Sequence, residues 1–421
     1  MAENNLTFHG CDVAELVEKY GAPLYIMSED EIRERCREIK RDFTDRYPGT
    51  RAAFASKACQ TLDICRIVDS EGMGLDVVSG GEIYAALKAG VDPAKLEFNG
   101  NAKSRQELEL ALDSGVGIII IDNISELDIL EKMAAQKGKK QAVSLRVTPG
   151  VDSHTHQFIS TGQLDSKFGF SPEEIMEFAA EKALNSEHLD LVGLHYHVGS
   201  QLHENDSHIM ATELMLKLFG QLKEKYGFIP KEINCGGGFG VHYAGDPQCT
   251  KVSYFMDPVM KLIDEYFEKA GDPRPVVAIE PGRWVVAEAG ITVYEITSVK
   301  TNAAGRTYYS VDGGLPDNPR TALYDAKYEA EAVGKVSEPH DRKVTIAGKC
   351  CESGDILIWD IMLPDMQPGD LLAVYATGAY NYSMASNYNR QPRPAMVMIK
   401  EGIPRISVKR ETYQDLIERE I

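Results

Sequence analysis

Short continuous runs of apolar residues recur along the chain, and the stretches between them show the 3.6-residue spacing of amphipathic helices. Continuous apolar strands that alternate with helices are typical of a parallel sheet covered by helices. Repetition of this unit over roughly 250 residues predicts an α/β fold with a (β/α)₈ barrel, and the alternative is a doubly wound open sheet. The eight runs lie near residues 51–57, 74–79, 95–100, 117–122, 142–147, 191–198, 232–238 and 276–282.

Serine and glutamate residues mark the beginnings of several predicted helices. A serine followed three residues later by glutamate satisfies free N–H groups in the first helical turn. The signal at Ser28 and Glu31 opens a charged amphipathic helix that we expect to reach Phe43. The signature occurs at Ser28 with Glu31, Ser79 with Glu82, Ser104 with Glu107 and Ser171 with Glu174.

After Gly290 the pattern changes to short strand-like runs separated by turn residues, which is typical of an all-β sandwich or a small barrel. We expect this part to end in a helix that begins near Glu411, and the apolar segment Leu24–Met27 to add a strand to it. The predicted domains are a barrel over residues 29–289 and an all-β domain made of residues 1–28 and 290–421.

Charge and cysteine content narrow the possible partners and location. The formal net charge is -19, which argues against nucleic acid or an anionic membrane as a partner. We find no signal segment and no apolar run near the roughly 20 residues that cross a bilayer. The 8 cysteines are scattered without metal-binding spacing. Together these features predict a cytoplasmic protein with reduced thiols.

Polar and ionisable residues follow most of the predicted strands. In barrels of this class the chemistry lies at the carboxyl ends of the strands, so we expect these side chains to gather at one rim. They are Lys57, Asp76, Ser79, Asn99 to Asn101, Asp122, Arg146, His195, His197, Gly236 to Gly238 and Glu280 to Arg283.

Each of these residues also has a simpler interpretation. Lys57 taken alone is more readily an exposed lysine at a strand exit. His195 and His197 alternate on one strand, where they are candidates for metal ligands or for hydrogen-bonded, stacked rings. The run Gly236–Gly240 is either a packing turn or a set of backbone N–H groups that binds phosphate.

Taken together, the strand ends fit one cofactor, pyridoxal 5'-phosphate. This cofactor needs a lysine amine for its Schiff base, donors for its phosphate, and often a carboxylate against its pyridine nitrogen. Lys57, the glycine run and Glu280 meet these needs, and a planar ring such as that of His197 could stack on the cofactor.

Several motifs resemble those of the fold-type III pyridoxal-phosphate decarboxylases, in an order and spacing that run through nearly the whole chain. Among the members of that family, the sequence is most similar to those that convert meso-2,6-diaminopimelate to L-lysine and carbon dioxide. The motifs are Phe54-Ala55-Ser56-Lys57-Ala58, His195 to Gln201, Gly236 to Gly240, Glu280-Pro281-Gly282-Arg283, Cys351 to Asp355 and Gly378-Ala379-Tyr380.

The resemblance implies a role for each matching residue. Lys57 would carry the cofactor, His197 would stack on its ring, and Glu280 would pair with its pyridine nitrogen. Cys351 would donate the proton that replaces the lost carboxylate, from the β domain of a partner subunit. The resemblance therefore also implies a homodimer with shared active sites. The phosphate would be held by Ser200, Gly237, Gly238, Gly240, Gly282, Arg283 and Tyr380, and Asp76 is a further cofactor-binding candidate.

The second amino-acid head of this small substrate calls for further partners. Arg283, Arg320 and Tyr324 suit its far carboxylate, because guanidinium binds carboxylate in a bidentate manner. Glu352 suits its far ammonium group, and Tyr380 is a further substrate-binding candidate. Arg320 is the discriminating residue, since ornithine and arginine have no second carboxylate, although a surface ion pair would also explain it.

Three alternatives remain open at this point. They are a decarboxylase acting on ornithine, arginine or a carboxylated polyamine precursor, a non-catalytic pyridoxal-phosphate-binding homologue, and a metal-dependent barrel hydrolase. The chain also departs from the family pattern at Phe54, Cys59 and Trp284, and at Lys349-Cys350, which leaves the substrate preference open. The length of the loop from Asp152 to Lys167 suggests a lid.

Overall fold

The computed structural model describes residues 4–150 and 166–421, so the predicted lid lies almost entirely outside the described residues. Contacts divide the chain into two compact units. The barrel unit contains Arg35–Gly240 and Cys249–Trp284, and the β unit contains the residues up to Glu34, Val241–Gln248 and Val285–Ile421. The predicted domain limits, a barrel over 29–289 and an all-β domain of 1–28 and 290–421, stay a prediction.

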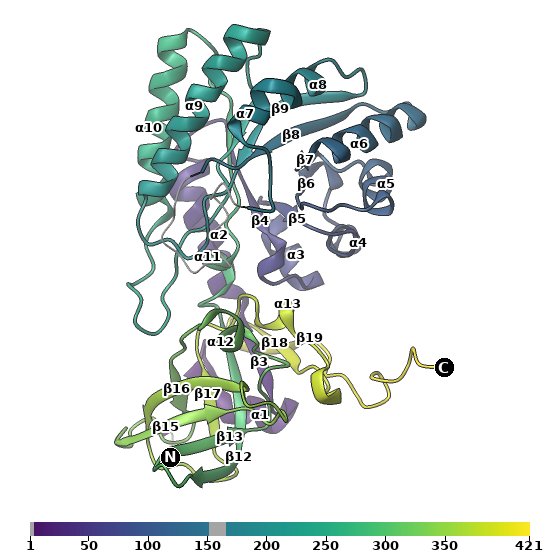
Figure 1. Cartoon of the computed structure of the whole chain (residues 1–421). Coiled ribbons are helices and arrows are strands. Elements are labelled where there is room, and N and C mark those ends of the chain that lie inside the picture. Colours follow the sequence, from purple (N-terminus) through teal and green to yellow (C-terminus); the bar gives the residue numbers. More distant parts are fainter. Residues whose placement is uncertain (1–3, 151–165) are drawn as a thin grey trace. The chain divides into compact units, whose positions relative to one another are not determined.

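The barrel unit holds a closed parallel barrel in the order β10-β11-β4-β5-β6-β7-β8-β9, which confirms the predicted (β/α)₈ fold (Figure 1). Closure is made by β11 beside β4, where Val277 lies opposite Thr50. The strands are β4 (Thr50–Ala55), β5 (Gly74–Val77), β6 (Leu96–Phe98), β7 (Ile118–Ile121), β8 (Gln141–Val147), β9 (Leu189–Tyr196), β10 (Glu232–Asn234) and β11 (Val276–Ile279).

Helices connect these strands and cover the outside of the barrel (Figure 1). Their starts follow the predicted signals. Ser79 accepts from Glu82 N, and full capping boxes join Ser104 with Glu107 and Ser171 with Glu174. The helices are α2 (Glu29–Ile39), α3 (Leu62–Ser70), α4 (Gly80–Ala89), α5 (Arg105–Ser114), α6 (Ile124–Lys137), α7 (Pro172–Glu174), α8 (Ala180–Leu184), α9 (Asp206–Tyr226), α10 (Val252–Ala270) and α11 (Arg283–Val286).

The β unit is built on a mixed sheet in the order β16-β15-β13-β12-β3-β18-β19, with β17 paired to both β12 and β14. The strand expected from Leu24–Met27 is β3 (Leu24–Ser28), which pairs antiparallel with β12 and parallel with β18. In the core of the β unit, Leu24 and Ile26 of β3 pack against Val293 and Val397. The other strands are β12 (Gly290–Thr301), β13 (Thr307–Val311), β14 (Ala330–Ala332), β15 (Arg342–Ala347), β16 (Ile356–Leu363), β17 (Leu371–Val374), β18 (Ala395–Lys400) and β19 (Ile403–Val408).

Two short helices, α12 (Arg320–Tyr324) and α13 (Asn381–Met384), lie between strands of the β unit, and α1 (Val13–Tyr20) precedes β3. The predicted helix near Glu411 is wrong, because residues 411–421 form only turns. The helix expected to reach Phe43 ends at Ile39 and continues as a π-helical turn over Lys40–Thr44.

Two further features bear on the predictions from composition. All eight cysteines are free thiols. Over residues 4–150 and 166–421, no helix is both long enough and apolar enough to cross a membrane.

Candidate active site

Lys57 lies directly after the first barrel strand. Strand β4 ends at Ala55, and Ser56–Ala58 form a single 3₁₀ turn in which the lysine side chain is exposed while its two neighbours are buried. The turn is held against the end of β11, since Ala55 N donates to Pro281 O at 3.2 Å. The amine is therefore presented at the carboxyl end of the barrel.

Glu280 follows β11 and is buried at the same end of the barrel. Its carboxylate accepts from the side-chain amides of Asn99 at 3.1 Å and Asn234 at 2.9 Å, and His195 Nε2 lies 3.1 Å from both oxygens. Burial raises the pKa of this carboxyl, but the charge and hydrogen bond of His195 and the charge of Lys57 lower it by more. Glu280 is therefore ionised, as a partner of a protonated pyridine nitrogen needs to be.

Asp76, at the end of β5, is a second buried carboxylate beside this site. It accepts from Asn99 Nδ2 at 2.6 Å. Burial, together with the charge of Glu280, raises the pKa of Asp76 to about 7, although Lys57 opposes the shift. Lys57, Asp76 and Glu280 therefore interact within one site, and Glu280 carries the negative charge more firmly than Asp76.

His197 follows β9 directly, since that strand ends at Tyr196. Its Nδ1 accepts from Gly237 N at 3.2 Å, which places the ring proton on Nε2. Burial and the positive charges of Lys57 and Arg146 lower the pKa of His197 well below its usual value. The ring is thus neutral and oriented by the glycine run, as stacking on a flat cofactor requires.

Most N–H groups of the glycine run are already used inside the barrel unit. Gly236 N donates to Asn234 Oδ1 at 2.9 Å and Gly240 N donates to Leu202 O at 2.8 Å. A Cβ on Gly238, whose φ is +101°, would lie 2.4 Å from Gly199 O. The N–H groups of Gly238 and Phe239 have no protein acceptor among the described residues. They are the better candidates for binding phosphate.

The predicted phosphate residues outside the glycine run also come together in the barrel unit. Arg283 Nη2 donates to Ser200 Oγ at 3.0 Å. A Cβ on Gly282 would lie 2.8 Å from the Cβ of Ala55, so only glycine lets this turn approach the strand that leads to Lys57. Ser200, Gly282 and Arg283 thus belong to the same site as the lysine.

The remaining predicted residues lie in the β unit. Arg320 begins α12 and is buried, and its guanidinium lies 5.6 Å from the ring centroid of Tyr324 and 5.2 Å from that of Tyr380. Tyr380 has the unusual φ of +66°. These three residues form one cluster, in which the aromatic rings favour the positive charge.

Cys351 and Glu352 are both exposed on the loop between β15 and β16. This loop is organised by Asp355, whose carboxylate accepts from Cys350 N at 2.8 Å and from Leu315 N at 2.6 Å. Burial, helped by Asp355, raises the pKa of Cys350 to about 12, so that neighbouring thiol stays protonated. Cys351 N donates to Asn389 Oδ1 at 3.0 Å, which fixes the backbone that presents its thiol.

Sequence reasoning missed the groups that hold these residues in place. Asn234 and the contact of His195 with Glu280 were not predicted, and Asp355 was noted only as part of a motif, without a role. A polar residue inside a short buried strand was the available signal for Asn234. His195 was considered as a metal ligand, but its Nε2 faces Glu280, and no group of three potential metal-binding side chains occurs within 4–150 and 166–421.

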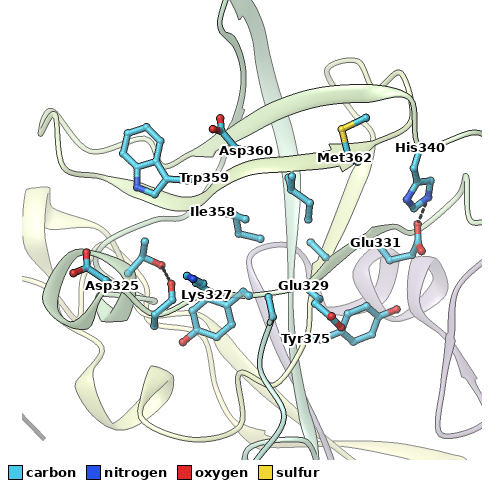
Figure 2. Close-up of a pocket in the computed structure, with 16 residues that line it drawn as sticks. Asp325, Lys327, Glu329, Glu331, His340, Ile358, Trp359, Asp360, Met362 and Tyr375 are labelled. Carbon is cyan, nitrogen blue, oxygen red and sulfur yellow. Dashed lines mark hydrogen bonds and ion pairs between the residues drawn. The ribbon is translucent and has the colours of Figure 1, made fainter. Parts of the chain in front are cut away.

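A separate pocket of about 660 Å³ lies in the β unit and contains none of the predicted site residues. Figure 2 shows Trp359, Asp360 and Met362 of β16 on one side and Glu329, Glu331 and Tyr375 on the other. His340 Nε2 and Glu331 Oε1 form an ion pair of 3.1 Å at its edge. Arg320, Tyr324 and Tyr380 do not line it, although Thr321 and Tyr328 of its lining adjoin Arg320.

Comparison with known proteins assigns the chain to a family. The model of the pyridoxal-dependent decarboxylase family, pyridoxal binding domain, matches residues 29–287. This chain belongs to the pyridoxal-dependent decarboxylases.

Individual members of the family match over the full length. Diaminopimelate decarboxylase of Bacillus subtilis (strain 168) is 45% identical over 418 residues, which cover 99% of this chain and 95% of the relative. A solved structure of diaminopimelate decarboxylase from M. jannaschii with L-lysine has a TM-score of 0.93 and 35% identity, covering 100% and 96% of the two chains. That of the Helicobacter pylori enzyme with L-lysine has a TM-score of 0.89 and 31% identity, covering 97% and 98%.

Membership in the decarboxylase family settles three of the expectations. The chain is a pyridoxal-phosphate-dependent decarboxylase, and its fold is that of the family. The cofactor is pyridoxal phosphate, to which the neutral ring of His197 and the ionised Glu280 are suited. The roles of individual residues stay predictions.

Proposed function

We propose that this decarboxylase removes the carboxylate from one end of meso-2,6-diaminopimelate to give L-lysine and carbon dioxide. The observation that carries the proposal is the full-length similarity to several diaminopimelate decarboxylases. Arg320, a buried guanidinium near the rings of Tyr324 and Tyr380, supports it because a substrate with a second carboxylate needs such a partner.

The barrel unit would hold the cofactor. Pyridoxal phosphate, when bound, supplies a ring that accepts the electron pair left when carbon dioxide departs. Lys57 would attach it, Glu280 would keep its ring nitrogen protonated, and His197 would cover one face of the ring. Ser200, Arg283 and the glycine run would bind its phosphate, with the N–H groups of Gly238 and Phe239 as its backbone donors.

The β-unit residues would recognise the substrate and complete the reaction. Arg320 and Tyr324 would bind the far carboxylate, and Glu352 would bind the far ammonium group. Cys351 would deliver a proton from its thiol to the carbon that has lost the carboxylate. Asp355 would position both, since it fixes the loop on which they lie.

We further propose that the enzyme is a homodimer in which Cys351 and Glu352 serve the partner's barrel. The family resemblance supports this arrangement. A location in the cytoplasm also stays a prediction, which fractionation of the host cell would test.

The substrate assignment is tested by carbon dioxide release from diaminopimelate, ornithine, arginine and lysine under one set of conditions. We expect kcat/KM for diaminopimelate to exceed that for each of the other three amino acids by at least about a hundredfold. Ornithine, arginine and lysine have no second carboxylate to pair with Arg320. Release from ornithine or arginine but not from diaminopimelate would show that the alternative decarboxylase is correct.

The attachment of the cofactor is tested separately by borohydride reduction of the holoenzyme and peptide mapping. We expect the label on the peptide that contains Lys57. A label on another lysine would overturn the assignment of the site. Cofactor binding with no release of carbon dioxide from any of the amino acids would favour the non-catalytic homologue.

A further inference from the structure

Glu280 is the end of a chain of polar contacts that crosses the inside of the barrel. Glu97 on β6 and Asn234 on β10 are in contact, although these two strands are not neighbours in the barrel. Asn234 Nδ2 donates to Glu97 Oε2 at 2.6 Å and to Glu280 Oε1 at 2.9 Å. One amide nitrogen therefore uses both of its hydrogens on two different buried carboxylates.

The orientation of this amide is fixed by a third contact. Asn234 Oδ1 accepts from Gly236 N at 2.9 Å, so the nitrogen and not the oxygen faces the carboxylates. The same residue thus connects Glu97, Glu280 and the first glycine of the run that orients His197.

Asn99 likewise joins Glu280 to a second buried carboxylate. Its Nδ2 donates to Asp76 Oδ1 at 2.6 Å and to Glu280 Oε1 at 3.1 Å. Glu280 Oε1 is therefore shared by two asparagine amides and His195, whereas Oε2 has His195 as its only hydrogen-bond partner among the described residues. Oε2 keeps acceptor capacity for a pyridinium N–H.

The far end of the chain of contacts is anchored by Arg51 at the start of β4. Its Nε and Nη2 donate to the two oxygens of Glu232 at 2.8 and 2.7 Å, and its Nη1 donates to Glu97. The bidentate contact with Glu232 orients Arg51, which bonds Glu97 Oε1 while Asn234 bonds Oε2. Both oxygens of Glu97 are therefore held by side chains of the barrel unit.

We propose that Asn99 and Asn234 are positioning residues that hold Glu280 ionised and aim its Oε2 at the pyridine nitrogen of the cofactor. The inference rests on the proposed cofactor geometry, in which Glu280 pairs with that nitrogen. Asn99 joins Glu280 to Asp76, and Asn234 joins it to Glu97. Asp76 and Glu97 both take up protons more readily than Glu280 does. Burial, with the charge of Glu280 adding to the effect, raises the pKa of Asp76 to about 7, and burial raises that of Glu97 to about 8.

The test compares two ligands that differ only at the ring nitrogen. These are pyridoxal phosphate and its 1-deaza analogue, in which a CH group replaces the nitrogen. We expect Asn234→Ala to weaken binding of pyridoxal phosphate about tenfold, and binding of the deaza analogue by less than about twofold. The deaza analogue has no ring nitrogen to pair with Glu280, so its binding does not depend on the orientation of that carboxylate. We also expect kcat to fall while KM for substrate changes little.

Gln141→Ala is the matched control. Gln141 also has a buried side-chain amide in the barrel, and this amide donates to Val116 O and Gly117 O. It lies at the start of β8, away from the carboxyl ends of the strands. This variant is expected to bind both ligands as the unaltered protein does. If Asn234→Ala fails to fold, as judged by the circular dichroism of the cofactor-free protein, Asn99→Ala provides the same comparison.

Equal weakening of both ligands by the asparagine variants, or no weakening of either, would overturn the inference. These outcomes are independent of the substrate, because binding is measured without it. Failure to decarboxylate diaminopimelate would instead count against the proposed function and leave the binding comparison valid.

Discussion

Asp76, Glu97 and Glu280 are three buried carboxyl groups of the barrel, and their pKa values are shifted in different directions. Glu280 is stabilised as an anion by His195 and by two asparagine amides. Asp76 accepts a hydrogen bond from Asn99, and burial raises its pKa to about 7. A buried carboxyl group with few hydrogen-bond donors takes up a proton, whereas a buried one with several donors keeps its charge. Small differences in local donors thus decide which side chain is ionised.

The free energy of unfolding of the cofactor-free protein should therefore depend on the protonation of Asp76. Its pKa is raised on folding, so between about pH 4 and pH 7 the folded state holds a proton that the unfolded state releases. This contribution to stability is complete at low pH and is lost as the pH rises through 7. The slope of unfolding free energy against pH approaches about -1.4 kcal/mol per pH unit for this group.

We expect Asp76→Asn to remove this part of the pH dependence. Chemical denaturation at pH 5, 6, 7 and 8 measures it, and the difference in stability between the variant and the unaltered protein should grow in favour of the variant as the pH rises. A constant difference across the series would show that Asp76 is ionised throughout.

At the scale of elements, serine caps define where the barrel helices begin. The capping box of α5 joins Ser104 and Glu107, and Glu107 also accepts from Gly80 N at 2.8 Å, which ties α5 to the start of α4. Ser104→Ala should lower the free energy of unfolding by about 1 kcal/mol. Ser114, at the other end of the same helix, donates to Leu110 O, and Ser114→Ala should have a smaller effect.

Urea denaturation of both variants measures this difference. Equal losses would mean that Ser104 acts as an ordinary surface serine and that the helix start is fixed by tertiary packing alone.

The pattern of the chain predicted the barrel well, because eight apolar strands and their helix starts carry strong local signals. It placed Lys57 and Glu280 at strand ends for the same reason. It missed Asn234, because contacts across the barrel interior join residues far apart in sequence. The predicted helix near Glu411 failed because Tyr413 is 80% exposed and Ile417 is 48% exposed. A short helix without a buried face is not stable.

At the scale of the whole molecule, the proposed sharing of sites is tested by mixing two inactive variants. Lys57→Ala removes the proposed cofactor lysine, and Cys351→Ala removes the proposed proton donor. If the two groups come from different subunits, a mixed dimer has one site with both residues intact. Random exchange of subunits should then restore about a quarter of the activity of the unaltered enzyme.

The mixture is denatured and refolded together, and each variant refolded alone serves as the control. No recovery in a mixture that is shown to contain mixed dimers would place Lys57 and Cys351 of each site on one chain.

The position of β3 has a consequence for how the chain folds during its synthesis. This strand is made before every barrel strand, yet it lies between β12 and β18, and its parallel partner begins at Ala395. The barrel strands are all complete by Ile279. The barrel can therefore form while translation continues, whereas the sheet around β3 stays open until β18 has been made. During that interval Leu24–Ser28 is an apolar strand with both edges unpaired, which exposes it to pairing with other chains.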